Sequence, residues 1–501
     1  MNCARMIEDR NTRKQKQKAR EGNTDNGSVP DNEIRVNRYD NLVKENALFE
    51  NYYKSLNIVP DIEWDDFLVA LKNPLPVTFR VTGFRSHAIE MMRLIRERYF
   101  QPLEKAIIEN VAIEKPKELV WYPGSFAWQL NLSRMQLRQI PELQKLKEFL
   151  YEQTEHGNIS RQEAVSMIPP LVLGIEPHHK VIKRKYFNYT STLFILLDYL
   201  QVLDMCAAPG SKTAQIIEFL HQDETNPIPN GFVIANDVDN KRCYTLVHQV
   251  KRLESPCFAI INHDASVLPN MRYPNGDGDT STSNLLFDRI LADVPCTGDG
   301  TLRKNPDLWA KWNPGHGFNM HGLQARIAAR GAQLLAPGGL MVYSTCSMNP
   351  IENESVIANL LQSFDDELSL VDIRPKLPGL KTTPGLTKWK VIAKNNEIYE
   401  SFEQVPLSLQ TLIRPNMFPP ANDILQKLNL DRCVRILPHH QDTGAFFIAV
   451  LHKREKNIEK PSQSNDVTST VATNDIEEES ITTTKKRIID IRSSAMIEEY
   501  N

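Results

Sequence analysis

The seven cysteines of this 501-residue chain form no CxxC pair and no closely spaced framework. Such pairs are typical of structural zinc sites and of small secreted disulfide scaffolds, so we expect reduced thiols in an intracellular protein. The sequence also lacks an apolar run of the ~18 residues that a membrane-spanning helix requires, and residues 1–20 do not have the pattern of a secretory signal. We therefore expect no membrane partner and no metal ion.

An excess of charge of one sign is missing as well. Lys and Arg total 59 and Asp and Glu total 62, which gives a net charge of −3. A surface that binds nucleic acid must then come from local clusters. The basic candidates are Arg303-Lys304, Lys241-Arg242 and Lys251-Arg252, and the aromatic candidates for base stacking are Trp121-Tyr122, Trp309 and Trp312.

Changes in composition divide the chain into five predicted segments. Residues 1–40 form a polar, basic tail that we expect to be disordered, and residues 41–176 form a first folded region. A linker at 177–201 precedes a catalytic domain at 202–452, and 453–501 form a second, mostly disordered tail.

Two patterns indicate α+β structure in the first folded region. Residues 76–81 (PVTFRV) alternate in the way that predicts a strand. Ser160 and Glu163 have the spacing of a capping box, which predicts a helix that ends at Pro169-Pro170.

Strand and helix patterns alternate from residue 202 onward, which predicts a doubly wound α/β sheet of the Rossmann-like type. The predicted strands are VLDMC (202–206), FVIAND (232–237), CFAII (257–261), FDRILAD (287–293), LMVYSTC (340–346), CVRILP (433–438) and AFFIAVL (445–451). The predicted helices are SKTAQIIEFLH (211–221), DNKRCYTLVHQVKRL (239–253) and HGLQARIAARGAQLLA (321–336).

The first of these strands runs into a turn of small residues, and a helix follows directly. Backbone N–H groups of this turn would face an anionic group of a ligand at the helix N-terminus. The turn has neither the G-x-x-x-x-G-K-[ST] of a P-loop nor a full G-x-G-x-x-G. The candidate cofactor-binding residues of the turn are Cys206, Ala207, Ala208, Pro209, Gly210, Ser211 and Lys212.

Acidic residues follow the next two strands. Asp237 lies where a carboxylate suits the two hydroxyls of a ribose, and Asp264 lies where it could read an adenine amino group. Ligands bind at the carboxyl ends of strands in such sheets, so a nucleoside with a carboxylate-bearing tail fits, and S-adenosylmethionine is the expected cofactor. The alternative is that these acids only cap helices.

Two cysteines follow two later strands, Cys296 in DVPCTGDG (293–300) and Cys346 in YSTCSMNPIENE (343–354). A single cysteine at such a place is commonly a small buried hydrophobe. The thiolate is the reactive form, and an unperturbed cysteine titrates near ~8.5, so a reactive site must favour the anion. Residue type alone does not decide which thiol attacks. The buried-hydrophobe interpretation is the one we apply to the side chains of Cys206, Cys243, Cys257 and Cys433.

The motifs LDMCAAPGSKT, DVPCTGDG and YSTCSMNPIENE together resemble the NSUN-type (Sun-domain) RNA cytosine carbon-5 methyltransferases, in particular the eukaryotic subgroup that modifies tRNA. The resemblance runs from about residue 41 to 452 and includes GNISRQEAVSMIPP, ANDVDNKRCYTLVHQ, IRPNMFPP and RILPHHQDTGAFF. It implies S-adenosylmethionine as cofactor, RNA, above all tRNA, as partner, RNA binding by the first folded region, and a monomer.

The resemblance also implies a role for each residue of the site. In the resembled enzymes a thiolate adds to cytosine carbon-6, carbon-5 accepts the methyl group and loses its proton, and the thiol is eliminated. The resemblance assigns the attack to Cys346 and the release of product to Cys296. Asp293 would hold the N3 and amino edge of the ring and line the cofactor site, and Lys212 would support the target base.

Other interpretations are weighed beside this one. One is a catalytically impaired RNA-binding member of the same family, and another is a methyltransferase that acts on a protein or a small molecule. The presence of Asp293, Cys296 and Cys346 counts against both. The basic segment TRKQKQKAR (12–20) suggests the nucleus, including the nucleolus, with the cytoplasm as the alternative. The resembled tRNA enzymes usually carry a further C-terminal RNA-binding domain, and we expect no counterpart of it in residues 453–501.

Residues 181–201, VIKRKYFNYTSTLFILLDYLQ, depart from the resembled pattern, in which the HHK segment runs directly into the first strand of the sheet. Without them the sequence reads PHHKVLDMCAAPG. The segment begins with Val and ends with Gln, which GT-containing and CAG codons encode. We hypothesise that it is a translated in-frame intron that projects from the catalytic domain.

Two histidine pairs, His178-His179 and His439-His440, raise the question of a metal site. Adjacent residues of an extended chain point to opposite sides, and no cysteine or carboxylate lies at ligand spacing. We expect structural or RNA-contacting roles for both pairs.

Overall fold

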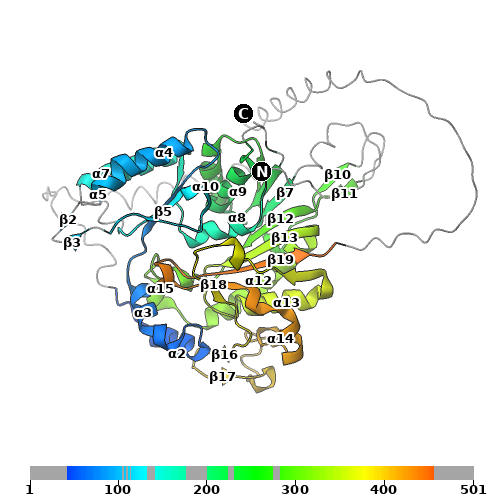
Figure 1. The fold of residues 1–501 in the computed structure, drawn as a ribbon. Coiled ribbons are helices and arrows are strands. Elements are labelled where there is room, and N and C mark those ends of the chain that lie inside the picture. The colour runs from blue at the N-terminus through cyan, green and yellow to red at the C-terminus, as the bar shows by residue number, and fades with distance from the viewer. Residues whose placement is uncertain are drawn as a thin grey trace, which may run out of the picture. The chain divides into compact units, whose positions relative to one another are not determined.

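A nine-stranded sheet forms the centre of the fold (Figure 1). The structure is a computed structural model that describes residues 42–103, 107–108, 111–112, 114–132, 141–176, 200–223, 229, 231–274 and 282–455. The strands of the sheet are β7 (Leu200–Asp204), β8 (Gly231–Asn236), β9 (Phe258–Ile261), β12 (Phe287–Asp293), β13 (Leu335–Thr345), β14 (Leu368–Leu370), β15 (Thr383–Pro384), β18 (Val434–Ile436) and β19 (Phe446–Lys453).

The order of the parallel strands creates a switch point beside the first of them. These strands are arranged β9-β8-β7-β12-β13, and β19 adds to β13 in the antiparallel direction. The chain moves outward from β7 to β9 and then returns to place β12 on the other side of β7. Ligands of such sheets bind outside the carboxyl ends of the strands where the order reverses.

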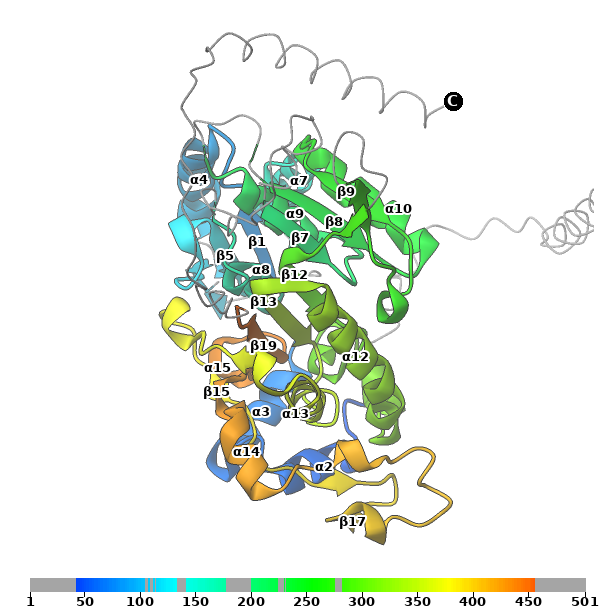
Figure 2. The ribbon, with the colours of Figure 1, turned by 90° about the vertical axis from the view of Figure 1, so that its right-hand side faces the viewer.

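Different helices cover the two faces of the sheet (Figure 2). Consecutive strand residues point to opposite faces, so Leu203 and Ile290 join one apolar core while Val202 and Leu291 join the other. The helices of the first core are α2 (Ala47–Leu56), α3 (Trp64–Lys72), α12 (Gly315–Leu334) and α13 (Glu354–Ser363); those of the second are α8 (Ile168–Val172), α9 (Ser211–Leu220) and α10 (Asn240–Val250). The predicted doubly wound α/β fold is confirmed.

The region before the catalytic domain divides between two places. Helices α2 and α3 pack in the core of the catalytic sheet, where Phe49 and Tyr53 contact Trp309 and Trp312. The following residues form a separate antiparallel sheet with the order β4-β5-β1-β6 and its own apolar core. The elements here are β1 (Val77–Val81), α4 (Ala88–Ile95), α5 (Gln101–Leu103), β2 (Ile107–Ile108), β3 (Val111–Ala112), β4 (Lys117–Glu118), β5 (Ala127–Leu130), α7 (Pro141–Glu155) and β6 (Ile159–Ser160).

A buried polar network joins this small sheet to α9. Arg80 of β1 and Glu218 of α9 form an ion pair with both side chains almost completely buried. Arg80 Nε also donates to Gln162 Oε1 at 2.9 Å, and Gln162 Nε2 donates to Gln215 Oε1 of α9 at 3.1 Å. The small sheet is therefore fixed to α9, the helix that begins within the predicted cofactor-binding turn at residues 206–212.

Short elements complete the described chain. They are η1 (Asp61–Glu63), η7 (Ala265–Val267), β10 (Arg272–Pro274), β11 (Thr282–Asn284), α11 (Leu308–Lys311), β16 (Val391–Ile392), β17 (Ile398–Tyr399), α14 (Asn422–Leu428) and α15 (Pro438–Gln441), together with further single turns of 3₁₀ helix. Among all the residues that the structure describes, no helix is long and apolar enough to cross a bilayer.

The predicted helix that ends at Pro169-Pro170 is wrong. Ser160 is the last residue of β6, a 3₁₀ turn covers Val165–Met167, and α8 begins at Ile168 with the two prolines in its first turn. Residues of a first turn need no intrahelical N–H donor, so prolines open this helix where we expected them to stop one.

The sheet begins two residues before the predicted domain boundary at 202. Leu200 pairs with Gly231 and Gln201 with Phe232, and both side chains are buried. The last two residues of the predicted insertion are therefore part of β7. Residues 181–199, the pair His178-His179 and the predicted tails lie outside the described residues, except for residues 453–455, of which Lys453 ends β19.

Candidate active site

Two loops that carry a cysteine lie side by side at the carboxyl edge of the sheet. Asp293, the last residue of β12, pairs with Ser344 near the end of β13. Val294 N donates to Ser344 O at 3.1 Å, and Gly300 N donates to Cys346 O at 2.9 Å. These backbone bonds hold the loop after β12 against the loop after β13 and bring the two cysteines together.

The two thiols are in direct contact. Cys296 Sγ and Cys346 Sγ are 3.2 Å apart, and both side chains are half-buried. The hydrogen bond with Cys346, together with burial, raises the pKa of Cys296 well above its usual value. A thiol that stays protonated can donate to the other sulfur, so Cys296 can stabilise a thiolate on Cys346.

A lysine and a carboxylate are paired beside the thiols. Lys212 Nζ lies 2.8 Å from Asp293 Oδ2, and Ser344 Oγ donates to Asp293 Oδ1 at 2.7 Å. Burial acts to lower the pKa of Lys212, but the neighbouring Asp293 outweighs it and the pKa is raised. The Lys212 side chain is thus a fixed cation, located 5.4 Å from the ring centroid of Phe446.

The predicted cofactor turn connects β7 to α9 at the switch point. Ala207 N donates to Asn236 O at 2.7 Å, which holds the turn against the end of β8. Gly210 has φ +109°, and a Cβ atom there would lie 2.8 Å from Leu246 Cδ1, so only glycine fits. Cys206 is half-buried at the start of the turn, while Ser211 and Lys212 open the ten-residue helix α9.

The two acids that we assigned to the cofactor have different surroundings. Asp237 is almost completely buried, and its carboxylate accepts from Ala208 N at 3.1 Å and from Asp239 N at 3.0 Å. Asp264 is exposed and caps η7 by accepting from Ser266 N at 2.8 Å, which lowers its pKa. Both carboxylates therefore have a structural task beside the ligand role that remains a prediction.

Glu352 is a residue of this site that sequence reasoning missed. It is completely buried, and burial, with a contribution from Asp299, raises its pKa to about 7. Thr297 donates to it from N at 2.9 Å and from Oγ1 at 2.6 Å, and Ser347 donates from Oγ at 2.6 Å. Because Thr297 follows Cys296 and Ser347 follows Cys346, this one carboxylate ties both cysteine loops together. Its place in NPIENE, six residues after Cys346, was the available sequence signal.

A second buried acid fixes the same loops from the other side. Asp299 accepts from Tyr53 Oη, from Trp312 Nε1 at 3.1 Å and from Met348 N at 2.8 Å. Burial raises its pKa. Helix α2 and the aromatic residues around it thus support the loops that carry the thiols.

Several predicted RNA contacts are wrong because the side chains are buried. Trp121, Tyr122, Trp309 and Trp312 all belong to apolar cores, so they offer no platform for base stacking. Arg303 is also buried, where it donates to Asn73 O at 3.1 Å, Pro74 O at 2.8 Å and Thr443 O at 2.8 Å. Lys304, Lys241, Arg242 and Lys251 are exposed and remain candidates for contact with phosphates.

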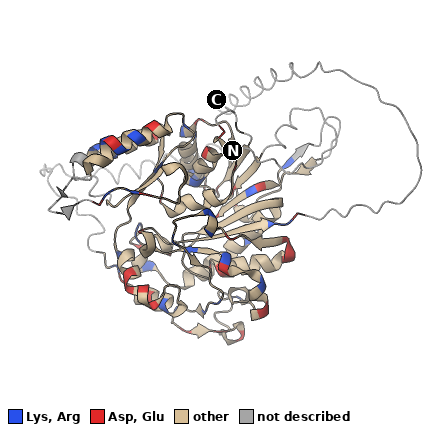
Figure 3. Cartoon of the chain, in the orientation of Figure 1, with Lys and Arg blue, Asp and Glu red and all other residues tan. Residues whose placement is uncertain are grey.

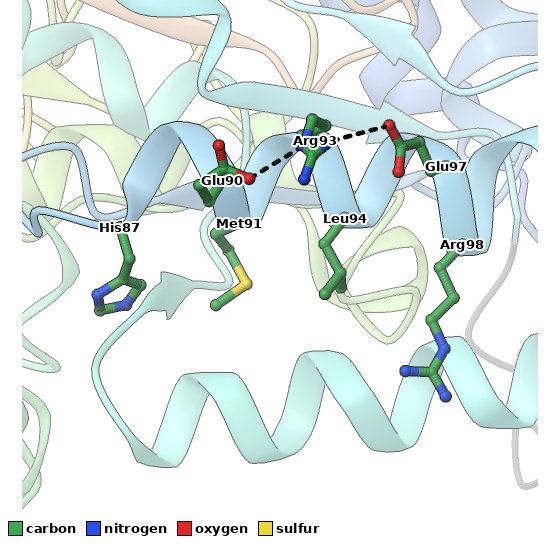
Figure 4. Close-up of a pocket in the computed structure, with 7 residues that line it drawn as sticks. All are labelled: His87, Glu90, Met91, Arg93, Leu94, Glu97 and Arg98. Carbon is green, nitrogen blue, oxygen red and sulfur yellow. Dashed lines mark hydrogen bonds and ion pairs between the residues drawn. The ribbon is translucent and has the colours of Figure 1, made fainter.

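A cleft of about 440 Å³ lies along α4, beside α7 (Figure 4). Arg93 lies there between Glu90 and Glu97, and acidic and basic residues alternate along this part of the surface (Figure 3). The cleft contains none of the residues at the carboxyl edge of the sheet. It is lined by His87, Glu90, Met91, Arg93, Leu94, Glu97 and Arg98.

The fold, with a turn of small residues at the switch point and acids after the next two strands, defines a Rossmann-like methyltransferase domain. Residues 196–452 match the family described as 16S rRNA methyltransferase RsmB/F, and the chain belongs to this family. A crystal structure of a methyltransferase homolog protein from Pyrococcus horikoshii has the same fold, with a TM-score of 0.50 and 24% identity over 81% of this chain and 94% of that one.

Relatives of known activity are considerably more similar in sequence. A tRNA (cytosine(34)-C(5))-methyltransferase of Drosophila melanogaster is 48% identical over 446 residues, which is 87% of this chain and 56% of the relative. A multisite-specific tRNA:(cytosine-C(5))-methyltransferase of Saccharomyces cerevisiae is 42% identical over 444 residues, 89% of this chain and 60% of the relative. The chain thus spans less than two thirds of the length of these relatives.

Proposed function

We propose that the protein transfers a methyl group from S-adenosylmethionine to carbon-5 of cytosine in RNA, with tRNA as the substrate. The observation that carries this proposal is the pair of thiols 3.2 Å apart, beside the Lys212–Asp293 ion pair at the carboxyl edge of the sheet. Two contacting thiols have a use in a reaction that forms and then resolves a cysteine adduct. Methyl transfer to a protein side chain or a small molecule requires neither.

The cofactor supplies an activated methyl group, and the donor set of the site fits it. The turn from Cys206 to Ser211 presents backbone groups at the start of α9, and Asp237 and Asp264 follow the next two strands. Carboxylates at these places suit the hydroxyls and the amino group of a nucleoside. Asp293 and Lys212 would line the side of the site that faces the base.

Cys346 would act as the nucleophile. Its thiolate adds to carbon-6 of cytosine, the ring electrons move to carbon-5, and carbon-5 takes the methyl group. A base then takes the carbon-5 proton, the electrons of that C–H bond restore the carbon-5–carbon-6 double bond, and the Cys346 sulfur leaves carbon-6. The Lys212 ammonium and the Asp293 carboxylate, which form an ion pair at 2.8 Å, would hold the polar edge of the ring and offset charge that develops there.

Cys296 would assist the first and the last step of this reaction. As a protonated thiol it stabilises the Cys346 thiolate before attack, and it lies close enough to return a proton to the Cys346 sulfur on release. A variant without Cys296 should therefore form the adduct and resolve it slowly.

The tRNA methyltransferase activities of the two relatives support tRNA as the partner. A nuclear location, including the nucleolus, rests on the basic segment at 12–20 and is proposed with the cytoplasm as the alternative. We also propose that the protein acts as a monomer. Size-exclusion chromatography with light scattering would test that state.

Mass spectrometry of 5-methylcytidine in tRNA incubated with the purified protein and S-adenosylmethionine tests the proposal. We expect methylation by the unaltered chain, none by Cys346→Ala, and a band of retarded mobility on a denaturing gel for Cys296→Ala. Cys257→Ala is the control, because Cys257 directly precedes β9 and so lies at the amino edge of the parallel strands, opposite the edge with the two cysteine loops. Tight tRNA binding without methylation or adduct in any variant would instead establish the catalytically impaired, RNA-binding alternative.

A further inference from the structure

The histidine pair that lacked a partner in the sequence meets a carboxylate in the structure. His439 Nε2 lies 2.8 Å from Glu63 Oε2, and His440 Nε2 lies 3.1 Å from the same oxygen. Ligand atoms of all three residues lie within 4.8 Å of one another. Within the described ranges, this is the one group of three such residues with that spacing.

Helical backbone explains why two adjacent histidines point the same way. His439 and His440 lie in α15, where neighbouring side chains diverge by about 100° and not by the 180° of an extended chain. Their ring centroids are 4.4 Å apart. Glu63 closes η1, and the following helix α3 packs on α15, so residues 376 positions apart in the chain converge (Figures 1 and 2).

We propose that Glu63, His439 and His440 bind a divalent transition-metal ion, and that Zn²⁺ is the ion their chemistry favours. Imidazole nitrogen and carboxylate oxygen are ordinary zinc ligands, and hard-oxygen ions such as Mg²⁺ seldom take two histidines. The site lies outside the methyl-transfer site described above and does not depend on the proposed function.

The geometry needs only a small adjustment to hold an ion. Tetrahedral zinc with ligand distances of about 2.0–2.2 Å places its ligand atoms about 3.3 Å apart. The 2.8 Å distance between His439 and Glu63 must then lengthen by about 0.5 Å, and the 3.1 Å distance between His440 and Glu63 by about 0.2 Å. The Nδ1 atoms of both histidines have no hydrogen-bond partner, so no such bond opposes rotation of the rings. Glu63 is 41% exposed while the two histidines are 7% and 14% exposed, which leaves the carboxylate side open for a water ligand.

An ion at this place would join the N-terminal helices to the catalytic sheet. Helix α15 leads within a few residues to Ala445, whose N donates to Gly300 O at 3.0 Å in the loop of Cys296. Zinc would therefore stabilise the junction between α3 and the segment that enters β19. Thermal unfolding of the whole chain should shift to higher temperature when zinc is added.

Calorimetric titration of the chelator-treated full chain with Zn²⁺ near neutral pH tests the site. We expect one ion per chain, and an affinity at least about tenfold lower in Glu63→Gln and in His440→Asn, which circular dichroism should show to be folded. His87→Asn is the matched control, because His87 is an exposed histidine that contacts Asn158 at 3.0 Å, away from this cluster.

The thiols offer the competing site, since Cys296 and Cys346 are in contact. Titration with Co²⁺ separates the two, because cobalt bound by thiolate has an intense charge-transfer band in the near ultraviolet that cobalt bound by histidine and carboxylate lacks. We expect stoichiometric cobalt binding without this band, and the same result in Cys296→Ser. The proposal is overturned if the chain binds no ion stoichiometrically, if the Glu63 and His440 variants bind unchanged, or if the thiolate band accounts for all binding.

Discussion

The residues that follow the two contacting cysteines are both hydrogen-bonded to the carboxylate of Glu352. A contact of 3.2 Å between two sulfur atoms is useful only if both loops are held in place. Gln324 Nε2 adds a fourth hydrogen bond to the same carboxylate at 3.0 Å. The arrangement of the two cysteine loops therefore depends on one buried acid.

Replacing Glu352 by Gln should slow the reaction and change the pH dependence of stability. The amide keeps one acceptor oxygen and loses the other, so we expect kcat to fall by up to about a hundredfold with KM for RNA nearly unchanged. The pKa of Glu352 is raised to about 7 in the folded chain, above its value of 4.5. A raised carboxyl pKa stabilises the fold at low pH, and this contribution is lost as pH rises from about 4.5 to 7.

Urea unfolding at several pH values checks this prediction. The unaltered chain should lose roughly 3 kcal/mol of unfolding free energy from this group across that interval, and Glu352→Gln should lack this part of the slope. Equal slopes in the two proteins would contradict the assigned ionisation. An unchanged kcat would contradict the positioning role.

The two acids near the cofactor turn provide a matched pair of substitutions. Asp237→Ala removes the acceptor of Ala208 N and a candidate ribose ligand, so both stability and cofactor affinity should fall. The loss of a charge-assisted contact of roughly 1.5–3 kcal/mol corresponds to about a tenfold to hundredfold rise in the dissociation constant. Asp264→Ala should weaken cofactor binding, but it should lower the free energy of unfolding by only about 1 kcal/mol. The reason is that the hydrogen bond by which Asp264 caps η7 is exposed to solvent. Calorimetric titration and thermal unfolding separate the two effects.

At the scale of elements, the junction between the small sheet and α9 depends on one buried ion pair. Arg80 of β1 and Glu218 of α9 lie at 0% and 4% exposure, so removal of either partner leaves a buried charge without its counterion. The same helix α9 begins with Ser211 and Lys212 of the site. Loss of the pair should therefore be felt at the cofactor turn as well as in global stability.

Arg80→Ala should lower the free energy of unfolding by about 3–5 kcal/mol. The double substitution Arg80→Met with Glu218→Leu should cost considerably less, since it removes both charges together. Arg93→Ala is the control, because its ion pairs with Glu90 and Glu97 are exposed and screened by solvent, so their loss should change stability little. Equal melting temperatures of the Arg80 and Arg93 variants would contradict this account.

At the scale of the whole molecule, β7 is the strand on which the site depends. It lies between β8 and β12, and its end leads into the cofactor turn. Leu200 and Gln201 join it through backbone pairing with Gly231 and Phe232. Backbone pairing does not require these particular side chains, so His179 and Lys180 could take the two places if residues 181–201 were absent.

Deletion of residues 181–201 should therefore yield a folded and active protein. We expect soluble yield and melting temperature to be equal or higher, because the segment carries the apolar run TLFILLDYLQ that a soluble chain must cover. A second deletion of 181–199 keeps Leu200 and Gln201 and serves as the control for strand pairing. Failure of both deletion variants to fold, or transcripts that always retain these codons, would exclude a translated intron.

Local sequence patterns predicted most strands of the sheet, but not the short strands β14 and β15. Buried strands such as FDRILAD are read from a few consecutive apolar residues, and β12 has the predicted bounds, Phe287 to Asp293. The predicted cofactor-binding turn could be found in the sequence because such a turn requires glycine and small residues directly after a strand. Cys296 and Cys346 were assigned to one site by the family resemblance, and the structure brings their sulfur atoms to 3.2 Å from each other.

Only the tertiary structure decided which side chains are available and which acids they meet. Trp309 and Arg303 are residue types that often contact RNA. In the structure, however, α2 and the segments around Asn73 and Thr443 bury them. Glu63 reaches His439 from 376 positions away, a distance at which no spacing rule applies. Residue type and the local spacing of apolar residues determine secondary structure. Which side chains are buried, and which partners they contact, depends on how distant parts of the chain pack together, and this is a property of the whole chain.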